Sequence, residues 1–300
     1  MEQLPPLVCA VDDGYAGTLC VLMESLAAAH GTELPALRMI VLHHGLNGDS
    51  DRRIRTHAER MGLPIELRVV PRPSADFPVS EWVSDAVYLR LAAGEAITDH
   101  PVVLYLDADL LVLDDLRPLL RTPVAPVLLA AVRDAQHPVI GRGISLPGWR
   151  ELGVPAGRDY FNSGVMLLDL DGCRREGLFE ACRRFLAETP QHARFWDQDA
   201  LNWAAHDRWL RLDRRWNTFP LSALMRMPDY ENYAEDIIPV RQLIADEDTA
   251  AILHFAGPDK PWRPGYAPSR ALDLYRSFAA AARARQDGVL TGPPQGAAAQ

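Results

Sequence analysis

The chain has 300 residues, of which 48% are hydrophobic and 24% are charged, values typical of a globular protein with an ample core. Its net charge of −9 argues against a non-specific nucleic-acid binder, and four cysteines without C-x-x-C spacing argue against a zinc site. Apolar runs are too short for a signal peptide or a membrane span, so we expect a cytoplasmic protein.

The first seventy residues alternate strand patterns with helix patterns. Strands are expected at 7–11, 37–42 and 65–70, and the helix between the last two is expected to begin with Ser50 as its N-cap and to end at Gly62. This alternation predicts an α/β fold with a doubly wound, mostly parallel sheet flanked by helices. Asp12 and Asp13 follow the first strand, where such sheets bind nucleotides.

A second acidic pair follows a run of five apolar residues. Val102–Leu106 reads as a buried strand that ends in Asp107 and Asp109. In an extended chain, residues two apart point to the same side, so both carboxylates can reach one cation. Burying two unpaired carboxylates is costly, and a divalent metal would offset that cost.

Two other interpretations of this pair stay open at this point. The aspartates could be ordinary loop residues that cap the next segment of the chain. Alternatively, an apolar strand ending in D-x-D is the first motif of haloacid-dehalogenase-like phosphatases, with Asp107 as the nucleophile. That motif has Thr or Val two residues after its second Asp, where this chain has Leu111.

The remaining elements are expected in the following order along the chain. They are a helix at 85–93, a strand at 127–132 ending near Asp134, a long loop at 137–158, a strand at 165–170, a helix at 173–188, a helix that Asp197 caps, a strand at 209–212, an irregular segment at 225–247, a strand at 251–255 and an amphipathic helix at 269–285. We expect a single domain over residues 1–287 and a disordered tail over 288–300. Arginines on the terminal helix allow at most weak peripheral association with anionic membranes.

Six motifs occur in order between Val8 and Trp262. They are Ala10–Tyr15, Tyr88–Leu91, Leu104–Asp109, Tyr160–Val165, Trp196–Asn202 and His254–Trp262. Together they resemble the glycosyltransferase family that contains bacterial lipopolysaccharide galactosyltransferases and glycogenin, commonly called family 8. The resemblance implies a single GT-A-type, Rossmann-like domain. One departure is Gly14, where the bacterial galactosyltransferases carry Asn.

The resemblance implies a metal-dependent, retaining transfer of a hexose, galactose or glucose, from a UDP-sugar to a hydroxyl of a carbohydrate or other acceptor, with an α-linkage. Asp107, Asp109 and His254 would hold the metal, and this mixed oxygen and nitrogen set suits Mn²⁺ better than Mg²⁺. Lys260, the only lysine of the chain, would bind the diphosphate. The donor-binding residues implied by the resemblance are Asp12, Asp13, Tyr15, Arg90, Asp134, Asn162, Gly257 and Lys260.

The catalytic residues implied by the resemblance are Gln198 and its neighbours Asp197 and Asp199. Gln198 would lie beneath the anomeric carbon and stabilise an oxocarbenium-like state, since a carboxamide is a poor nucleophile. Asp199 is the one nearby carboxylate that could act as a nucleophile. The alternatives are the phosphatase described above and a catalytically inactive nucleotide-sugar binder.

Overall fold

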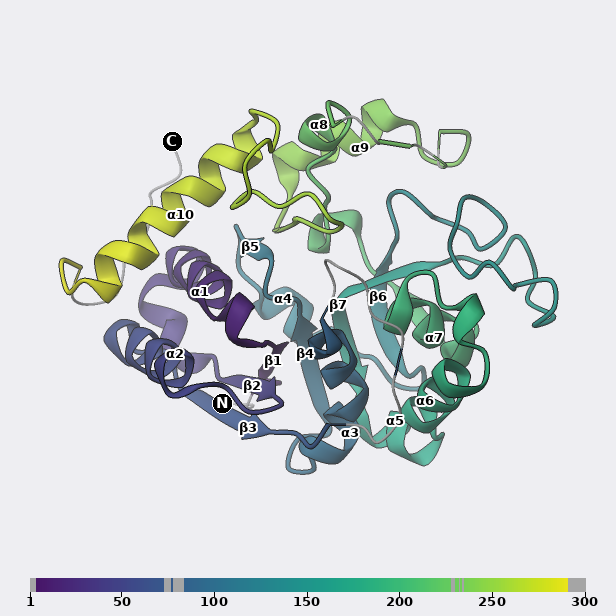
Figure 1. The fold of residues 1–300 in the computed structure, drawn as a ribbon, viewed down its shortest axis with the longest axis horizontal. Helices are drawn as coiled ribbons and strands as arrows, with labels where there is room; N and C mark the ends of the chain where they lie inside the picture. The colour runs from purple at the N-terminus through teal and green to yellow at the C-terminus, as the bar shows by residue number, and fades with distance from the viewer. Residues whose placement is uncertain are drawn as a thin grey trace.

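The computed structural model describes residues 4–72, 77, 84–227, 230–231, 233 and 235–290. A seven-stranded sheet with the strand order β3-β2-β1-β4-β7-β6-β8 forms its centre (Figure 1). The strands of this sheet are β1 (Leu7–Ala10), β2 (Met39–His43), β3 (Ile65–Val69), β4 (Val102–Leu106), β6 (Leu129–Arg133), β7 (Phe161–Asp169) and β8 (Trp209–Arg211). Only β7 runs antiparallel to its neighbours β4 and β6. The predicted α/β fold with a mostly parallel sheet is therefore confirmed.

Helices cover both faces of the sheet. The α-helices are α1 (Ala16–His30), α2 (Gly48–Met61), α3 (Ala93–Ala96), α4 (Arg117–Leu120), α5 (Leu170–Arg175), α6 (Leu178–Glu188), α7 (Trp196–Ala205), α8 (Leu221–Leu224), α9 (Val240–Asp246) and α10 (Arg270–Gln286). The 3₁₀-helices are η1 (Asp13–Tyr15), η2 (Gly31–Ala36), η3 (Asp85–Ala92), η4 (Pro190–His192), η5 (Arg214–Trp216) and η6 (Glu247–Thr249). Alternate residues of β4 point to opposite faces of the sheet and pack into two hydrophobic cores. Leu104 and Leu106 pack with α1 and α2, whereas Val103 and Tyr105 pack with α6 and α7.

A second, two-stranded sheet places a histidine beside the acidic pair. It consists of β5 (Leu110–Val112) and β9 (Ile252–His254), which run antiparallel with Leu110 opposite His254. Since β5 begins directly after Asp109, this register brings His254 next to that carboxylate. The sequence predicted a strand at 251–255 but not its partner, because three apolar residues are too short a pattern to distinguish from the end of β4.

Several predicted elements need correction. The N-cap of α2 is Asn47 rather than Ser50, since the Asn47 side chain accepts hydrogen bonds from the amides of Asp49 and Ser50. The predicted helix at 173–188 is two helices, because Gly177 adopts a left-handed conformation between them. The predicted irregular segment at 225–247 contains α9, and parts of that segment lie outside the described residues.

The predicted helix at 85–93 is wound as the 3₁₀-helix η3, and Gly94 lies inside the following α3. Side chains three residues apart are aligned along a 3₁₀-helix. Ser84, Val87 and Arg90 follow this spacing, and all three line the cavity described below. The tighter winding therefore turns one row of side chains toward the candidate site.

The terminal helix α10 packs across α1 and α2, and its arginines are partly engaged (Figure 1). Arg285 is buried and forms an ion pair with Glu24 of α1, and Arg270 forms one with Asp248. Arg285 is therefore not available at the surface, and the weak peripheral association with anionic membranes stays a prediction. Among the described residues, no helix is long and apolar enough to cross a membrane. Residues 291–300 of the predicted tail lie outside the described residues.

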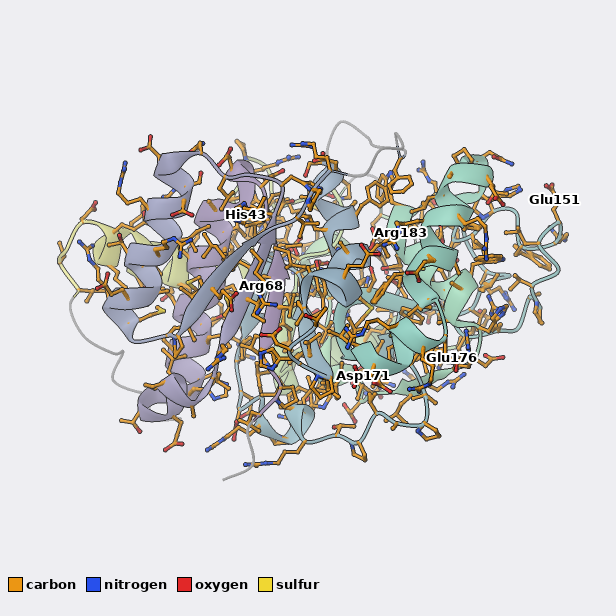
Figure 2. The ribbon with its side chains drawn as sticks, turned by 90° about the horizontal axis from the view of Figure 1, so that it is seen from below. His43, Arg68, Glu151, Asp171, Glu176 and Arg183 are labelled. Carbon is orange, nitrogen blue, oxygen red and sulfur yellow. The ribbon has the colours of Figure 1, made fainter. Side chains whose placement is uncertain are left out.

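The edge strand β3 of the main sheet carries charged side chains that form hydrogen bonds. Arg68 of the edge strand β3, labelled in Figure 2, donates hydrogen bonds to Glu66 at 2.7 Å and to Asp99 at 2.8 Å. Charged side chains on an edge strand disfavour pairing with another chain. The two predicted acidic pairs lie elsewhere, at the carboxyl ends of β1 and β4.

Candidate active site

One cavity collects most of the residues that the motifs single out. Its lining includes Asp12, Tyr15, Val87, Arg90, Tyr105, Asp107, Asp109, Asp134, Gln136, His137, Asn162, Ser163, Phe195, Trp196, Asp197, Gln198, Phe219, His254, Gly257 and Lys260. Every predicted site residue except Asp13 and Asp199 is among these. The cavity lies at the carboxyl ends of β1 and β4, as expected for an open α/β sheet.

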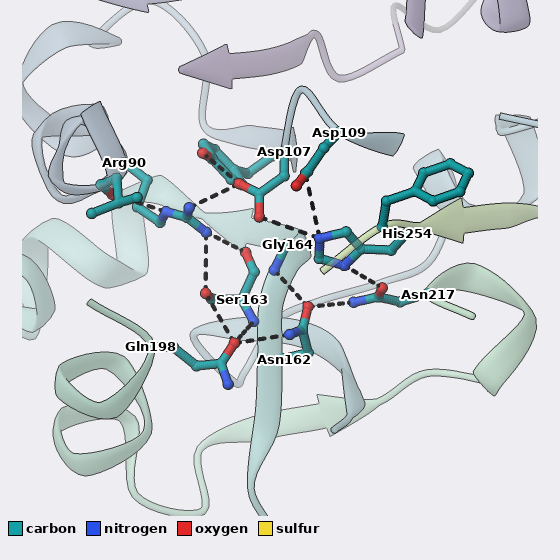
Figure 3. A network of polar contacts seen from close by, with 12 residues as sticks. Arg90, Asp107, Asp109, Asn162, Ser163, Gly164, Gln198, Asn217 and His254 are labelled. Carbon is teal, nitrogen blue, oxygen red and sulfur yellow. Dashed lines mark hydrogen bonds and ion pairs between the residues drawn. The ribbon is translucent and has the colours of Figure 1, made fainter. Parts of the chain in front are cut away.

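Three potential metal ligands converge in this cavity. One ligand atom each from Asp107, Asp109 and His254 lies within 4.8 Å of the other two. His254 Nε2 is 3.7 Å from Asp107 Oδ2 and 3.5 Å from Asp109 Oδ1 (Figure 3). Asp109 and His254 are buried, and Asp107 is partly exposed to the cavity. These distances suit three ligands arranged around one small cation.

The hydrogen bonds of His254 indicate which ring nitrogen faces the carboxylates as an acceptor. Asn217 Nδ2 donates to Asn162 Oδ1 at 2.8 Å, so the Asn217 oxygen faces His254 Nδ1, 2.9 Å away. Nδ1 therefore carries a proton, and when Nε2 carries none, its lone pair points toward Asp107 and Asp109. Three acceptors facing one another fit a divalent cation, and the Asn217 contact is the outer hydrogen bond that metal-binding histidines typically make.

Gly164 leaves room for this cluster. A Cβ atom at this position would lie 2.2 Å from His254 Cε1 and 2.9 Å from Asp107 Oδ2. The backbone of β7 thus passes directly beneath the histidine and the first aspartate. Glycine in the Phe161–Gly164 motif is required by this close approach, because any larger residue would displace the candidate ligands.

Lys260 is buried beside the second aspartate. Its ammonium group donates to Asp109 Oδ2 at 2.5 Å and to the carbonyl of Phe255 at 2.7 Å. Burial alone would raise the pKa of Asp109, but the neighbouring ammonium group of Lys260 holds that pKa well below its usual range. Asp109 is thus kept as a carboxylate, the form that binds metal, and Lys260 lies at the edge of the same cluster.

Arg90 connects the acidic pair to the Asp197 segment. Its guanidinium donates to Asp107 Oδ1 at 2.8 Å and pairs with Asp197 Oδ2 at 3.0 Å, and it also contacts Ser163 (Figure 3). Burial raises the pKa of Asp197 to about 6, although Arg90 counteracts this shift. The expectation that Asp197 caps α7 is wrong: the N-cap position is Phe195, and the Asp197 carboxylate points to Arg90.

A network of amides forms the wall opposite the metal ligands. Gln198 Oε1 accepts from Asn162 Nδ2 at 2.9 Å and from the backbone N–H of Ser163 at 3.0 Å. Gln198 Nε2 and Asn162 Nδ2 both donate to Asp134 Oδ2, at 3.3 and 3.2 Å. Burial acts to raise the pKa of Asp134, but contacts with His137 and Gln136 lower it overall. These groups can exchange hydrogen bonds with sugar hydroxyls.

The N-terminal acidic pair divides between two roles. Asp12 lines the cavity, and its side chain accepts from the backbone N–H of Tyr15 at 3.1 Å. Asp13 is exposed, lies outside the lining and accepts from the backbone N–H of Asn47 at 3.0 Å. The structure therefore brings Asp12 and Tyr15 into the candidate site, whereas Asp13 supports the start of α2.

Asp199 also lies outside the cavity lining. Its carboxylate is fully buried and accepts hydrogen bonds from the backbone of Leu146 and Phe195 and from the hydroxyl of Tyr160. A nucleophile must reach the anomeric carbon from the cavity, and this carboxylate does not face it. The interpretation of Asp199 as a nucleophile therefore lacks geometric support.

Fold and site together define a glycosyltransferase of the GT-A type, with an acidic D-x-D pair at the end of a central strand and sugar-compatible amides beyond it. A model of glycosyl transferase family 8 matches residues 6–264. The chain belongs to this family and is a glycosyltransferase enzyme, as the sequence resemblance implied.

Relatives and solved structures agree with this assignment. General stress protein A of Bacillus subtilis (strain 168) is 30% identical over 268 residues, which cover 87% of this chain and 88% of that protein. Lipopolysaccharide 1,2-glucosyltransferase of Escherichia coli (strain K12) is 29% identical over 70% of this chain and 59% of its own length. The galactosyltransferase LgtC, solved with donor and acceptor sugar analogs, is 29% identical with a TM-score of 0.73, covering 92% of this chain and 95% of that one.

Sequence reasoning missed Asn217, the residue that orients His254. It lies just after η5, outside every motif, and no apolar pattern or spacing distinguishes it from other loop asparagines. Ser163 lies in the Tyr160–Val165 motif but was not predicted as a site residue, yet its carbonyl and hydroxyl oxygens accept hydrogen bonds from Arg90. The only available signal was its place beside Asn162 in the Phe161–Gly164 motif.

Proposed function

We propose that this enzyme transfers a hexose, galactose or glucose, from a UDP-sugar to an acceptor hydroxyl, with a divalent metal, preferably Mn²⁺, and with retention of the α-configuration. The observation that carries the proposal is the cluster of Asp107, Asp109 and His254, whose three acceptor atoms face one another. Nitrogen among the ligands favours Mn²⁺ over Mg²⁺. When bound there, the metal supplies positive charge that stabilises the leaving diphosphate.

The chain's own residues supply the rest of the donor site. Lys260 adds a cation beside the same cluster, where a diphosphate oxygen would bind. Asp12 and Tyr15, which line the cavity, would hold the nucleoside, and Gly257 leaves the turn before Lys260 open. Asp134, Asn162 and Gln198 hydrogen-bond the sugar hydroxyls. Arg90 holds the side chains of Asp107 and Asp197 in place, because it contacts both.

The phosphatase alternative conflicts with both family and geometry. The family match covers residues 6–264 and belongs to glycosyltransferases. Asp107 Oδ1 accepts from Arg90 at 2.8 Å and from the Tyr105 hydroxyl at 3.0 Å, and Oδ2 faces His254 Nε2 at 3.7 Å, an arrangement that favours a metal ligand over a nucleophile. The cytoplasmic location stays a prediction from the sequence.

The first test is metal removal. We expect UDP release from UDP-galactose or UDP-glucose to vanish in excess EDTA and to return with Mn²⁺ more strongly than with Mg²⁺, because His254 contributes a nitrogen ligand. A coupled UDP assay at matched free metal concentrations measures this. Full turnover in excess chelator would remove the metal from the proposal while leaving the family assignment intact.

The second test is the stereochemistry of the product. The cavity offers an amide, Gln198, where an inverting enzyme would need a general base, and carboxamides are not bases. Attack on the face from which UDP departs lets the leaving phosphate accept the proton of the acceptor hydroxyl. We therefore expect an α-linked product with a small anomeric coupling constant in proton NMR. A β-linked product would reassign Asp197 as the candidate base.

A further inference from the structure

Two strained backbone positions lie close to Asp199. Among the described residues, only Leu146, Trp196 and His206 adopt positive φ angles without being glycine, at 42°, 46° and 51°. Side chains with a Cβ rarely adopt this conformation because the Cβ crowds the backbone. Such strain persists only where surrounding interactions hold it in place, and it gathers at functional sites.

The Asp199 carboxylate binds the backbone at the first of these positions, Leu146, and at Phe195, the residue before the second. Oδ1 accepts from the N–H of Leu146 at 2.8 Å, and Oδ2 accepts from the N–H of Phe195, directly before Trp196, at 2.6 Å. The Tyr160 hydroxyl donates to Oδ1 at 2.6 Å. One fully buried side chain therefore links the middle of the 137–158 loop to the turn that begins α7.

Both linked segments contribute residues to the cavity near Gln198, whose amide can bind sugar hydroxyls. The turn presents Trp196, Asp197 and Gln198 to the cavity, and the loop begins with His137, which also lines it. The His137 ring lies 4.9 Å from the Phe195 ring, so loop and turn contact each other at the wall. A shift of either segment would change the position of Gln198 relative to the donor sugar.

We propose that Asp199 is a positioning residue that fixes the strained turn at Trp196 and the 137–158 loop in one arrangement, and so sets the position of Gln198 for transfer. The effect on turnover rests on the function proposed above, whereas the anchoring of the two backbone segments does not. Only an ionised carboxylate offers acceptors to both amides and to the hydroxyl at once. Burial raises the pKa of Asp199 to about 6, and the three donors counteract that rise, so the carboxylate is ionised at neutral pH.

The decisive variant is Asp199→Asn. An asparagine has a single acceptor oxygen, so its NH₂ group must face either Phe195 N–H or the pair formed by Leu146 N–H and the Tyr160 hydroxyl. At least one anchor is lost with little change in volume. Tyr160→Phe is the matched control within the cluster, because it removes the hydroxyl donor and leaves both backbone anchors. Asp169→Asn is the control outside it, since Asp169 caps α5 and does not line the cavity.

Hydrogen–deuterium exchange tests the anchoring of the two backbone segments, and kinetics test the effect on turnover. In Asp199→Asn we expect amide exchange at Leu146 or Phe195 to rise at least about tenfold, with exchange across β4 unchanged. UDP affinity measured by calorimetry with Mn²⁺ should stay within about twofold, while UDP release from UDP-glucose or UDP-galactose falls about 100-fold, the cost typical of a misplaced catalytic group. Asp169→Asn should keep the parent's turnover to within a few-fold, and Tyr160→Phe should do the same at about pH 8 to 9, where Asp199 stays ionised without the hydroxyl donor.

The outcomes separate this role from the others. Lost turnover with unchanged exchange at both amides would overturn the proposal and indicate a direct chemical role for Asp199. Faster exchange with full turnover would overturn it as well, leaving Asp199 a structural anchor alone. If the parent protein releases no UDP from either sugar, the function proposed above fails, and unchanged exchange in Asp199→Asn would still refute the anchoring.

Discussion

The two walls of the cavity are held together by different kinds of interaction. The wall formed by Asp107, Asp109, His254 and Lys260 is a cluster of charges and one lone pair at the ends of β4 and β9. The wall formed by β7 and the start of α7 is dominated by hydrogen-bonded amides, whose partners lie between 2.8 and 3.3 Å apart. The first wall depends on which charges are present, and the second depends on where its dipoles point.

Asn217 joins the two walls. It contacts His254 Nδ1 at 2.9 Å on one side and donates to Asn162 at 2.8 Å on the other (Figure 3). The orientation of the metal-site imidazole is thus set by the same amide chain that faces the sugar. We infer that charge changes should act on the first wall alone, whereas changes in the amide chain should reach both.

The largest effect should follow the removal of one charge from the first wall. Asp109→Asn removes a ligand and a negative charge together, and we expect turnover to fall about 1,000-fold, on the order of 4 kcal/mol. The UDP release assay with Mn²⁺ measures this. Asp114→Asn is the matched control, because Asp114 is exposed and pairs with Arg215 away from the cavity. Near-normal turnover in a folded Asp109→Asn protein would make this carboxylate an ordinary loop aspartate.

The connection between the walls can be broken at Asn217. In Asn217→Ala the imidazole loses the hydrogen bond that fixes its tautomer, and we expect the Mn²⁺ concentration for half-maximal activity to rise about 10- to 100-fold. Saturating Mn²⁺ should restore much of the turnover, which distinguishes a loss of orientation from the loss of a ligand. A variant with unchanged Mn²⁺ dependence would show that the two walls are independent.

The sequence predicted the first wall more completely than the second. Asp107 and Asp109 stand out because carboxylates are conspicuous at the end of an apolar strand, and the D-x-D spacing alone puts both on one side. His254 could be assigned only through the family resemblance. Its actual position depends on the register of β5 with β9, a pairing of three residues that no local pattern encodes.

The second wall depends on tertiary contacts that residue types do not reveal. Asp197, Gln198 and Asp199 are consecutive and were predicted to act together, yet their side chains reach Arg90, Asn162 and the backbone of Leu146, respectively. A helix start sends neighbouring side chains in different directions, so proximity in the chain says little about shared function. Asn217 shows the same limit, since its role arises only where the segment after η5 meets the strands β7 and β9.

The smallest of these effects should come from Lys260, which tests whether the first wall recognises phosphate as well as metal. Lys260→Met keeps most of the buried stem and removes the charge, so packing changes little. A charge-assisted hydrogen bond contributes about 1.5 kcal/mol or more, so we expect the Kd for UDP with Mn²⁺ to rise at least about tenfold in calorimetry.

The same substitution should also lower the melting temperature without ligand, because Lys260 partly neutralises buried Asp109. Added Mn²⁺ should then stabilise Lys260→Met more than the parent, since a cation at Asp109 replaces the missing charge. An unchanged UDP affinity combined with the lower melting temperature would assign Lys260 to the neutralisation of Asp109 alone. The diphosphate would in that case depend on the metal and the backbone of the Gly257 turn.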